Sequence, residues 1–407
     1  MSEWWRGAVV YQIYPRSFLD ANGDGVGDLA GITGRLAYVA SLNVDAVWLS
    51  PFFTSPMKDF GYDVADYRNV DPLFGTLADF DALLAEAHRL GLRVIIDQVY
   101  SHSSDHHPWF GVSRQDRTNA KADWYVWSDP KADGSPPNNW LAVFGGPAWD
   151  WEPRRRQYYL HNFLKEQPDL NLHNPEVQQA ILDTATFWLD RGVDGFRLDV
   201  ANFFTHDLQL RDNPARPHPA PDKPSYLQRQ IYNRTRPETL AFVSRLRQLL
   251  DRYPDRMAVA EIAAEDQLAT MVDYTDGPER YHTAYSFVFL GQEFGAGFIR
   301  GQIERMLALS ERAWPSWAFS NHDVVRVVSR WGGEAPDPAT FAKLMLALLS
   351  TLRGTAFVYQ GEELGLPHAE VPFEKLQDPE GKTFWPRHKG RDGARTPMPW
   401  RAGRSEE

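Results

Sequence analysis

The feature that most constrains the fold is an alternation, along most of the 407-residue chain, of short apolar runs with helix-forming stretches. The run Val-Ile-Ile at 94–96 is apolar throughout, which is typical of a strand buried on both faces. Repeated strand–helix alternation indicates a parallel sheet, and eight strands favour closure into an α/β fold of the TIM (β/α)8 type. The eight predicted strands are Ala8–Pro15, Val44–Pro51, Arg93–Val99, Gly195–Ala201, Met257–Ile262, Tyr285–Phe289, Trp317–Asp323 and Ala356–Leu364.

Helical periodicity separates these runs. In Leu77–Gly91 the apolar residues fall on one stripe, and Gly91 is suited to end the helix. Asn174–Gly192 opens with a capping asparagine followed by proline and closes on glycine. Further helices are predicted at Pro237–Tyr253, Gly297–Ala313 and Thr340–Gly354. An open doubly wound sheet is the alternative fold, but no Gly-x-Gly-x-x-Gly follows an early strand.

Two connections are too long for simple barrel loops. The stretch from His102 to His173 lacks a helical period and is rich in Trp, Pro, Gly and Asn, so we interpret 103–173 as a small domain inserted after the third strand. Residues 1–102 then form the first part of the barrel, and 174–407 the remainder. A second, proline-rich loop runs from Phe203 to Arg236. Because 367–407 shows no helical pattern, we expect the chain to end before the last barrel helix.

Composition excludes several classes of function. The chain has no cysteine, which rules out disulfides, thiolate catalysis and cysteine-based zinc sites. Its formal net charge of −11 argues against nucleic acid and anionic membranes as partners. We see no apolar run long enough for a membrane span and no signal peptide at the N-terminus, and we therefore expect a cytoplasmic protein.

Charged residues stand at the ends of predicted strands, where barrels of this kind hold their active sites. Arg197 and Asp199 are two apart on one strand and share a face, so the cation can hold Asp199 ionised. Glu261 has apolar neighbours, which raise a carboxyl pKa as a general acid requires. Asp97 is expected to cap the helix after its strand. The other strand-end candidates are His102, His322 and Asp323.

Taken together, these segments resemble glycoside hydrolase family 13, the α-amylase superfamily, over nearly the whole chain. The resemblance implies that Asp199 is the nucleophile, Glu261 the acid/base and Asp323 the residue that stabilises the transition state through two sugar hydroxyls. It also implies that the first sugar subsite includes His102, Arg197 and His322. The 103–173 insertion matches the family's B domain, and Gln167-Pro-Asp-Leu-Asn171 matches that domain's terminal motif. Family members continue into a C-terminal β-sandwich domain, which we expect this chain to lack.

Two further motifs resemble the α-glucosidase and oligo-1,6-glucosidase branch. They are Asp59-Phe-Gly-Tyr62-Asp and Arg391-Asp-Gly-Ala-Arg395. In that branch the Asp and Tyr close the non-reducing end of the pocket, and an arginine, here assigned to Arg391 rather than Arg395, pairs with Asp59. Phe163 resembles the aromatic residue of that pocket. The resemblance thus implies a retaining, exo-acting α-glucosidase that releases glucose from the non-reducing end of short α-glucosides (oligosaccharides) through a covalent intermediate, with transglucosylation as a further outcome.

Linkage and product stay open. Val200, after the nucleophile, accompanies α-1,6 specificity in this branch, whereas the Phe203–Arg236 loop resembles α-1,4-preferring enzymes, and we favour α-1,4. Oligo-1,6-glucosidase, sucrose isomerase and trehalose synthase share the scaffold. A non-catalytic scaffold subunit would carry a membrane anchor and lose the carboxylates. A metal-dependent barrel hydrolase usually needs His-x-His on its first strand, and Tyr11–Tyr14 offers none.

An acidic loop follows the first predicted strand. Oxygen ligands at alternating positions suit a hard cation. The candidate ligands are Asp20, Asn22, Asp24, Val26 through its carbonyl, and Asp28. Gly31 stands where an EF-hand needs Glu, so the loop is not an EF-hand, but it resembles the structural metal site of this branch. We predict structural calcium or magnesium, no organic cofactor, and a monomer or homodimer. A solvated turn is the alternative.

Overall fold

The computed structural model describes residues 3–217, 223–333 and 335–400. Two segments singled out in the sequence, the long loop and the end of the chain, therefore lie partly outside the described residues, at 218–222 and 401–407.

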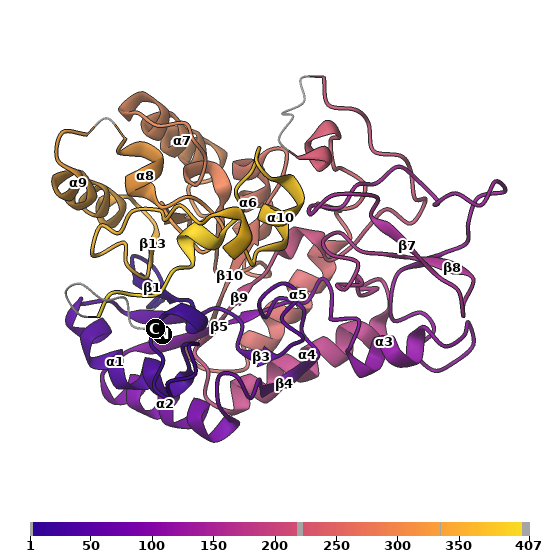
Figure 1. Cartoon of the computed structure of the whole chain (residues 1–407), viewed down its shortest axis with the longest axis horizontal. Coiled ribbons are helices and arrows are strands. Elements are labelled where there is room, and N and C mark those ends of the chain that lie inside the picture. Colours follow the sequence, from indigo (N-terminus) through magenta and orange to yellow (C-terminus); the bar gives the residue numbers. More distant parts are fainter. Residues whose placement is uncertain (1–2, 218–222, 334, 401–407) are drawn as a thin grey trace.

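Eight parallel strands form the central barrel (Figure 1). Their spatial order is β11-β10-β9-β5-β2-β1-β13-β12, and a parallel bridge between Ala284 and Pro315 brings the two ends of this order together. The predicted (β/α)8 barrel is confirmed. The strands are β1 (Val9–Ile13), β2 (Ala46–Leu49), β5 (Arg93–Gln98), β9 (Gly195–Leu198), β10 (Met257–Ile262), β11 (Thr283–Ser286), β12 (Ser316–Ala318) and β13 (Thr355–Tyr359).

The barrel strands are buried along almost their whole length, as their continuous apolar runs predict. Several predicted strands extend beyond the observed ones; β13, for example, ends at Tyr359 instead of Leu364. Two further differences concern β11 and β12. β11 begins and ends earlier than predicted, because Phe287–Phe289 forms a 3-10 turn after Ser286. β12 ends at Ala318, so Asp323 lies in the loop beyond the strand instead of at its last residue.

Helices follow most strands and cover the barrel. The predicted ends of two helices are confirmed: Thr76 and Asp79 form a reciprocal cap at the start of α2, and Gly91 follows its last turn with φ 78°. Asn174 caps α4, with Pro175 in its first turn. The helices are α1 (Leu29–Ser41), α2 (Leu77–Arg89), α3 (Pro108–Ser113), α4 (Pro175–Asp190), α5 (Thr239–Leu250), α6 (Gln267–Thr275), α7 (Ala296–Leu309), α8 (Val327–Trp331), α9 (Pro338–Thr351) and α10 (Pro379–Phe384).

The 103–173 segment carries a small antiparallel sheet of its own, at the side of the molecule away from α7 and α9 (Figure 1). Its strands are β6 (Trp127–Ser128), β7 (Trp149–Glu152) and β8 (Gln157–Leu160). Val126, Trp140, Trp149 and Leu160 pack in a separate apolar cluster beneath it. An antiparallel pair, β3 (Phe53–Thr54) with β4 (Asp66–Val70), extends the loop after β2.

The 367–407 segment shows no helical pattern in the sequence, but its described part contains a short α-helix. Pro379–Phe384 forms α10, whose first turn is capped by the Asp378 side chain. Six residues are too few to display a helical period, which is why the sequence pattern did not reveal it.

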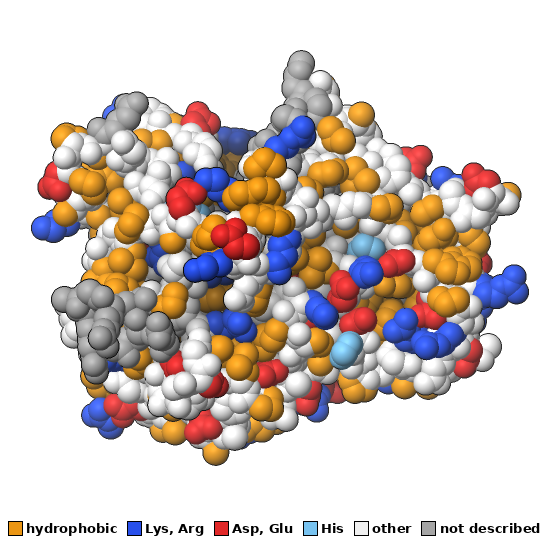
Figure 2. All heavy atoms as spheres, in the orientation of Figure 1, with side chains coloured by type: hydrophobic (Ala, Val, Ile, Leu, Met, Phe, Trp, Pro, Cys, Tyr) orange, Lys and Arg blue, Asp and Glu red, His pale blue; other side chains and the backbone are white. Residues whose placement is uncertain are grey.

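Within the described residues, no helix is both long enough and apolar enough to cross a membrane. Acidic and basic side chains are interspersed over the face shown in Figure 2.

Candidate active site

Arg197 is the centre of a fully buried cluster of charges. Its Nη1 lies 2.5 Å from Asp199 Oδ1 and 2.9 Å from Asp97 Oδ1. Its Nη2 lies 2.7 Å from Glu261 Oε1. Tyr285 Oη accepts a hydrogen bond of 2.9 Å from Nη2 and donates one of 3.2 Å to Glu261 Oε1. One guanidinium therefore holds Asp199 and Glu261 on its two terminal nitrogens.

Strand register explains this meeting. Arg197 on β9 is paired with Asp97 on β5 and with Val259 on β10, and Glu261 is paired with Tyr285 on β11. The helix-cap interpretation of Asp97 was wrong, because its two oxygens accept hydrogen bonds from Arg197, Trp48 and Tyr62. Asp97 is an ion-pair partner that fixes the arginine.

Asp97, Asp199 and Glu261 share the single positive charge of Arg197, so the three carboxyl groups do not all ionise readily. Burial raises the pKa of Glu261 to about 7, and the neighbouring Asp199 acts in the same direction while Arg197 opposes it. Burial also raises the pKa of Asp199 to about 7, against the lowering effect of Arg197. Asp199 accepts the short hydrogen bond from Arg197, which favours its ionised form. Glu261 is then the group that keeps a proton near neutral pH.

Val200 has an unusual backbone conformation directly after Asp199. Its φ of 36° and ψ of 51° lie in the left-handed region, which a β-branched residue seldom adopts. In this conformation its backbone N–H donates a 3.1 Å hydrogen bond to Glu261 Oε2. Strain of this kind persists where the surroundings enforce it, and here it orients Glu261 toward the end of β9.

Asp323 lies among cations from a distant part of the chain. Its Oδ1 accepts hydrogen bonds from Arg395 Nη2 at 2.8 Å and from Arg391 Nη1 at 3.2 Å. Burial alone would raise the pKa of Asp323, but the neighbouring His322 and the guanidiniums of Arg391 and Arg395 hold it well below its ordinary value. His322 is buried, and burial lowers its pKa to about 3, so it is neutral at physiological pH. Asp323 is thus ionised beside a neutral imidazole.

Asp59 and Arg391 form a wall on one side of the pocket. Arg391 Nη2 lies 2.6 Å from Asp59 Oδ1 and 2.7 Å from Asp378 Oδ1, and Gln167 Nε2 donates to Asp59 Oδ2 at 3.2 Å. Both arginines of the C-terminal motif reach the site: Arg391 contacts Asp59 and Asp323, whereas Arg395 contacts Asp323.

Tyr62, His102 and Phe163 complete the same end of the pocket. Tyr62 stacks on His322 with ring centroids 5.4 Å apart, and the two share a 2.6 Å hydrogen bond. His102 lies 3.1 Å from the Tyr62 carbonyl through Nε2 and 5.1 Å from Phe163, centroid to centroid. All three side chains line the cavity, together with Phe144 and Phe203.

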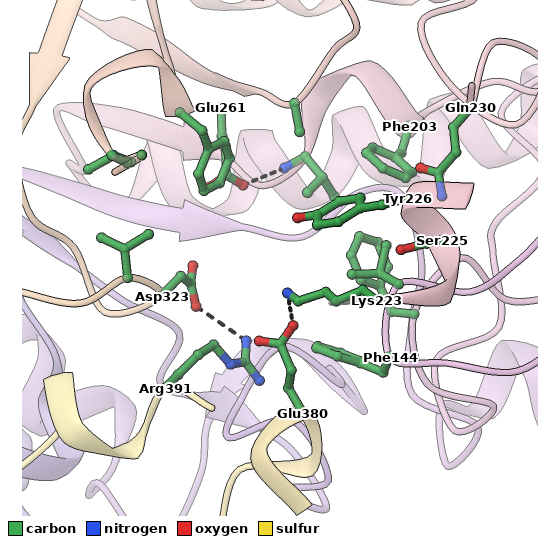
Figure 3. Close-up of a pocket in the computed structure, with 18 of the residues that line it drawn as sticks. Phe144, Phe203, Lys223, Ser225, Tyr226, Gln230, Glu261, Asp323, Glu380 and Arg391 are labelled. Atoms are coloured by element: carbon green, nitrogen blue, oxygen red, sulfur yellow. Dashed lines mark hydrogen bonds and ion pairs between the residues drawn. The ribbon is translucent and has the colours of Figure 1, made fainter. Parts of the chain in front are cut away.

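The cavity has a volume of about 720 Å³, and Asp199, Glu261 and Asp323 all line it. Figure 3 shows Asp323 and Arg391 on one side and Phe203 and Gln230 on the other. An ion pair between Lys223, from the 203–236 loop, and Glu380, on α10, lies between them. The catalytic and substrate-binding residues predicted from the sequence therefore line one cavity, except Arg197 and His322, which lie behind it and contact lining residues.

The acidic loop after β1 lies outside this chamber. Asp20 Oδ1, Asn22 Oδ1 and Asp24 Oδ1 accept hydrogen bonds from backbone N–H groups two residues further on, and Asp28 caps α1 through Gly31 N–H at 2.6 Å. In the described ranges no three His, Asp or Glu residues gather closely enough to hold a metal ion. The donor set also contains an amide and a backbone carbonyl, whose chemistry suits a hard cation. Metal binding here stays a prediction.

Sequence reasoning missed several residues of the site. Asp378 fixes Arg391 through both its carboxylate oxygens, and Tyr285 bridges Arg197 to Glu261. Glu380 and Lys223 could not be predicted because neither belongs to a motif at a strand end. Tyr285 stands within a predicted strand, and its register opposite Glu261 was the signal that could have identified it.

The barrel and its buried carboxylates define a glycoside hydrolase. Residues 12–406 match the family model described as "Alpha amylase, catalytic domain". The chain belongs to this family, glycoside hydrolase family 13.

Relatives place the chain more narrowly. It is 57% identical to a probable alpha-glucosidase of Rhizobium meliloti (strain 1021), over 98% of this chain and 74% of that protein. It is 40% identical to an oligo-1,6-glucosidase of Heyndrickxia coagulans, over 98% of this chain and 77% of the relative. The crystal structure of the alpha-glucosyl transfer enzyme XgtA matches with a TM-score of 0.97 and 62% identity, over all of this chain and 77% of the other. The chain is thus an α-glucosidase or α-glucosyl transfer enzyme of family 13.

Proposed function

We propose that the chain is a retaining, exo-acting α-glucosidase that releases glucose from short α-1,4-glucosides. Asp199 acts as nucleophile, Glu261 as acid/base and Asp323 as the carboxylate that stabilises the transition state. The observation that carries the proposal is the bridging of Asp199 and Glu261 by one buried guanidinium. A retaining glycosidase needs two carboxyl groups close together on either side of the bond that breaks, and a shared arginine keeps them so.

In the first step Asp199 forms a bond from its carboxylate oxygen to the anomeric carbon. The bond from that carbon to the glycosidic oxygen breaks, and Glu261 gives its proton to the departing oxygen. Arg197 keeps Asp199 ionised, and burial keeps Glu261 protonated near neutral pH. Asp323, ionised by its arginine neighbours, stabilises the positive charge that develops on the sugar ring.

In the second step Glu261, now ionised, takes a proton from water. The water oxygen bonds to the anomeric carbon from the face that the aglycone left, and the bond to Asp199 breaks. Two inversions give net retention, and each carboxyl returns to its starting protonation state.

Exo action follows from the wall that Asp59 and Arg391 form. Asp59, Arg391 and Asp378 are buried and linked by hydrogen bonds of 2.6 and 2.7 Å, so a longer chain cannot continue past them without breaking buried ion pairs. A terminal glucosyl unit fits against this wall, and the Lys223–Glu380 pair narrows the other side.

The preference for α-1,4 linkages rests on the 203–236 loop, while Val200 points toward α-1,6 activity. The chain is more similar to a probable alpha-glucosidase than to an oligo-1,6-glucosidase, which supports the α-1,4 preference. Maltose is the expected substrate, with isomaltose cleaved more slowly.

Glucosyl transfer is the second candidate function. The 62% identity to XgtA, an alpha-glucosyl transfer enzyme, favours it specifically. It needs no new chemistry, because a sugar hydroxyl replaces water in the second step and Glu261 takes its proton in the same way.

The test is an assay on maltose, isomaltose, sucrose and 4-nitrophenyl α-glucoside, with products resolved by chromatography and the first-formed anomer observed by NMR. The proposal expects α-glucose from maltose first. Accumulation of oligosaccharides at high substrate identifies transfer. Initial formation of β-glucose, or internal cleavage of a long α-glucan, contradicts it.

We further propose that the loop bearing Asp20, Asn22, Asp24, Val26 and Asp28 binds a structural calcium ion. The alternating oxygen donors support this, and the ion has no part in either chemical step.

A further inference from the structure

A group of arginines surrounds a single carboxylate at the edge of the substrate cavity. Arg216 Nη2 lies 2.6 Å from Glu265 Oε1, and Arg234 Nη2 and Arg229 Nε each lie 3.9 Å from that carboxylate. Arg216, Arg234 and Glu265 all line the cavity, whereas Arg229 is half exposed outside it. Three guanidiniums against one carboxylate leave this wall with excess positive charge.

Two of these guanidiniums are weakly paired among the described residues: Arg216 has a buried donor without a partner, and Arg234 has only long contacts. The Arg234 side chain is only 12% exposed, yet its guanidinium makes only distant contacts with described residues. These are a 3.4 Å hydrogen bond from Nε to the Gln230 carbonyl, the 3.9 Å ion pair with Glu265 and the face of Phe203 at 5.2 Å. Burial lowers the pKa of Arg234 to about 10. Arg216 Nε is buried without a partner among the described residues. Buried donors left unpaired are costly, and a ligand that accepts hydrogen bonds removes that cost.

The position of this wall relative to the carboxyl groups indicates which part of a substrate it faces. Glu265 follows Glu261 by four residues, on the loop after β10, and Phe203 and Gln230 lie across the cavity from Asp323 and Arg391 (Figure 3). Glu261 protonates the departing oxygen in the proposed reaction, so the arginines lie on the aglycone side, opposite the wall that holds the terminal glucose. Among the described residues that line the cavity, the acids on this side are Glu380, paired with Lys223, and Glu265 itself.

We propose that Arg234 and Arg216 form an anion subsite that recognises a carboxylate or phosphate group on the aglycone or acceptor. The inference rests on the proposed function, because that function defines the aglycone side. Guanidinium forks bind such oxyanions through two hydrogen bonds, which gives both affinity and orientation. α-Glucosides with an acidic aglycone are then preferred over neutral ones, although the chain as a whole is acidic.

Maltobionate and maltitol test the subsite as a matched pair. Both carry an α-1,4-glucosyl unit on an open-chain aglycone, and only maltobionate has a carboxylate. Isothermal titration of the Glu261→Gln variant measures binding without turnover. We expect maltobionate to bind about tenfold more tightly than maltitol at low salt, with the difference shrinking as salt is added. Equal or weaker binding of maltobionate overturns the proposal, whether or not any arginine variant folds.

Arginine variants in the Glu261→Gln background then assign the effect. We expect Arg234→Met to bind maltobionate and maltitol with equal affinity, and Arg234→Lys to keep part of the difference between them. Arg305 is exposed and paired with Asp266, so Arg305→Met should keep the full difference. A full preference for maltobionate in both Arg234→Met and Arg216→Met overturns the assignment to this wall. Turnover of maltose by the wild-type enzyme is measured in parallel. No turnover would refute the glucosidase proposal, whereas the anion subsite is tested by the binding titrations alone.

Discussion

The backbone N–H of Val200 donates a 3.1 Å hydrogen bond to Glu261 Oε2, across the boundary between β9 and β10. Val200 is the residue after Asp199, so the chain that carries one carboxyl group directly orients the other. The left-handed backbone at Val200 aims this N–H. The two proposed reacting groups thus form one rigid unit with Arg197.

The pH dependence of kcat/KM is predicted to be bell-shaped with its maximum near neutral pH. Glu261 must be protonated, and with a pKa of about 7 it loses its proton as the pH rises, so activity falls on the alkaline side. Asp199 must be ionised, and activity falls as it gains a proton on the acid side. Initial rates on maltose from pH 4 to 10 measure both limbs.

The Glu261→Gln variant tests whether the fall of kcat/KM at alkaline pH comes from Glu261. With α-glucosyl fluoride, whose leaving group needs no proton, the variant should keep measurable turnover, and the alkaline fall of the first step should disappear. With maltose it should lose at least about a thousandfold in kcat. An unchanged alkaline limb in the variant would show that another group titrates.

Glu261→Gln is also predicted to stabilise the protein at alkaline pH. The folded-state pKa of Glu261, about 7, lies above its ordinary value of 4.5, so the folded state binds this proton more tightly and its stability falls as the pH rises from 4.5 through 7. Removing the group removes that loss, about 3 kcal/mol at pH 8. Thermal unfolding at pH 5 and pH 8 measures it.

Exposed Glu304 on α7 supplies the control for this comparison. Glu304→Gln should leave the difference between pH 5 and pH 8 unchanged. A Glu261→Gln variant that melts below the wild type at pH 8 would contradict the sign of the effect.

Removal of the pocket wall is predicted to weaken selection for chain ends. Asp59→Ala leaves Arg391 paired with Asp378 and Asp323 but takes away a buried carboxylate facing the terminal sugar. We expect kcat/KM on maltose to fall by about a hundredfold, and the ratio of maltotetraose to maltose activity to rise. Asp66→Ala, at an exposed position of β4, is the matched control. A uniform loss across chain lengths would argue against a wall.

Calcium binding by the loop after β1 is predicted to raise thermal stability. Chelation should lower the Tm by several degrees and calcium should restore it, since an ion that binds only the folded state stabilises it. Asp24→Ala should abolish the response. Identical unfolding curves with chelator and with calcium would leave this loop as a solvated turn.

The barrel could be predicted because its strands are continuously apolar, and its reacting groups because charges at the ends of apolar strands stand out. Arg197, Asp199 and Glu261 all belong to such strands, and pairing between adjacent strands brings them together. The left-handed backbone at Val200 leaves no comparable pattern, since valine gives no sign of it in sequence.

The rest depends on contacts between segments far apart in the chain. Asp97 was misread because its partner Arg197 is a hundred residues away. Asp378 and Arg391 meet in a segment without regular periodicity, where short helices and turns are set by capping and ion pairs rather than by an apolar stripe. The cluster of arginines around Glu265 could not be predicted from the sequence for the same reason.

In the proposed reaction Asp199 forms a covalent bond with the anomeric carbon of the substrate. Incubation with 5-fluoro-α-glucosyl fluoride, followed by intact mass measurement and peptide mapping, tests it most directly, because the fluorine slows breakdown of the intermediate. We expect one fluoroglucosyl group per chain, attached to Asp199 and absent in Asp199→Asn. An adduct on Asp323 or Glu261, or rapid turnover by Asp199→Asn, would contradict it.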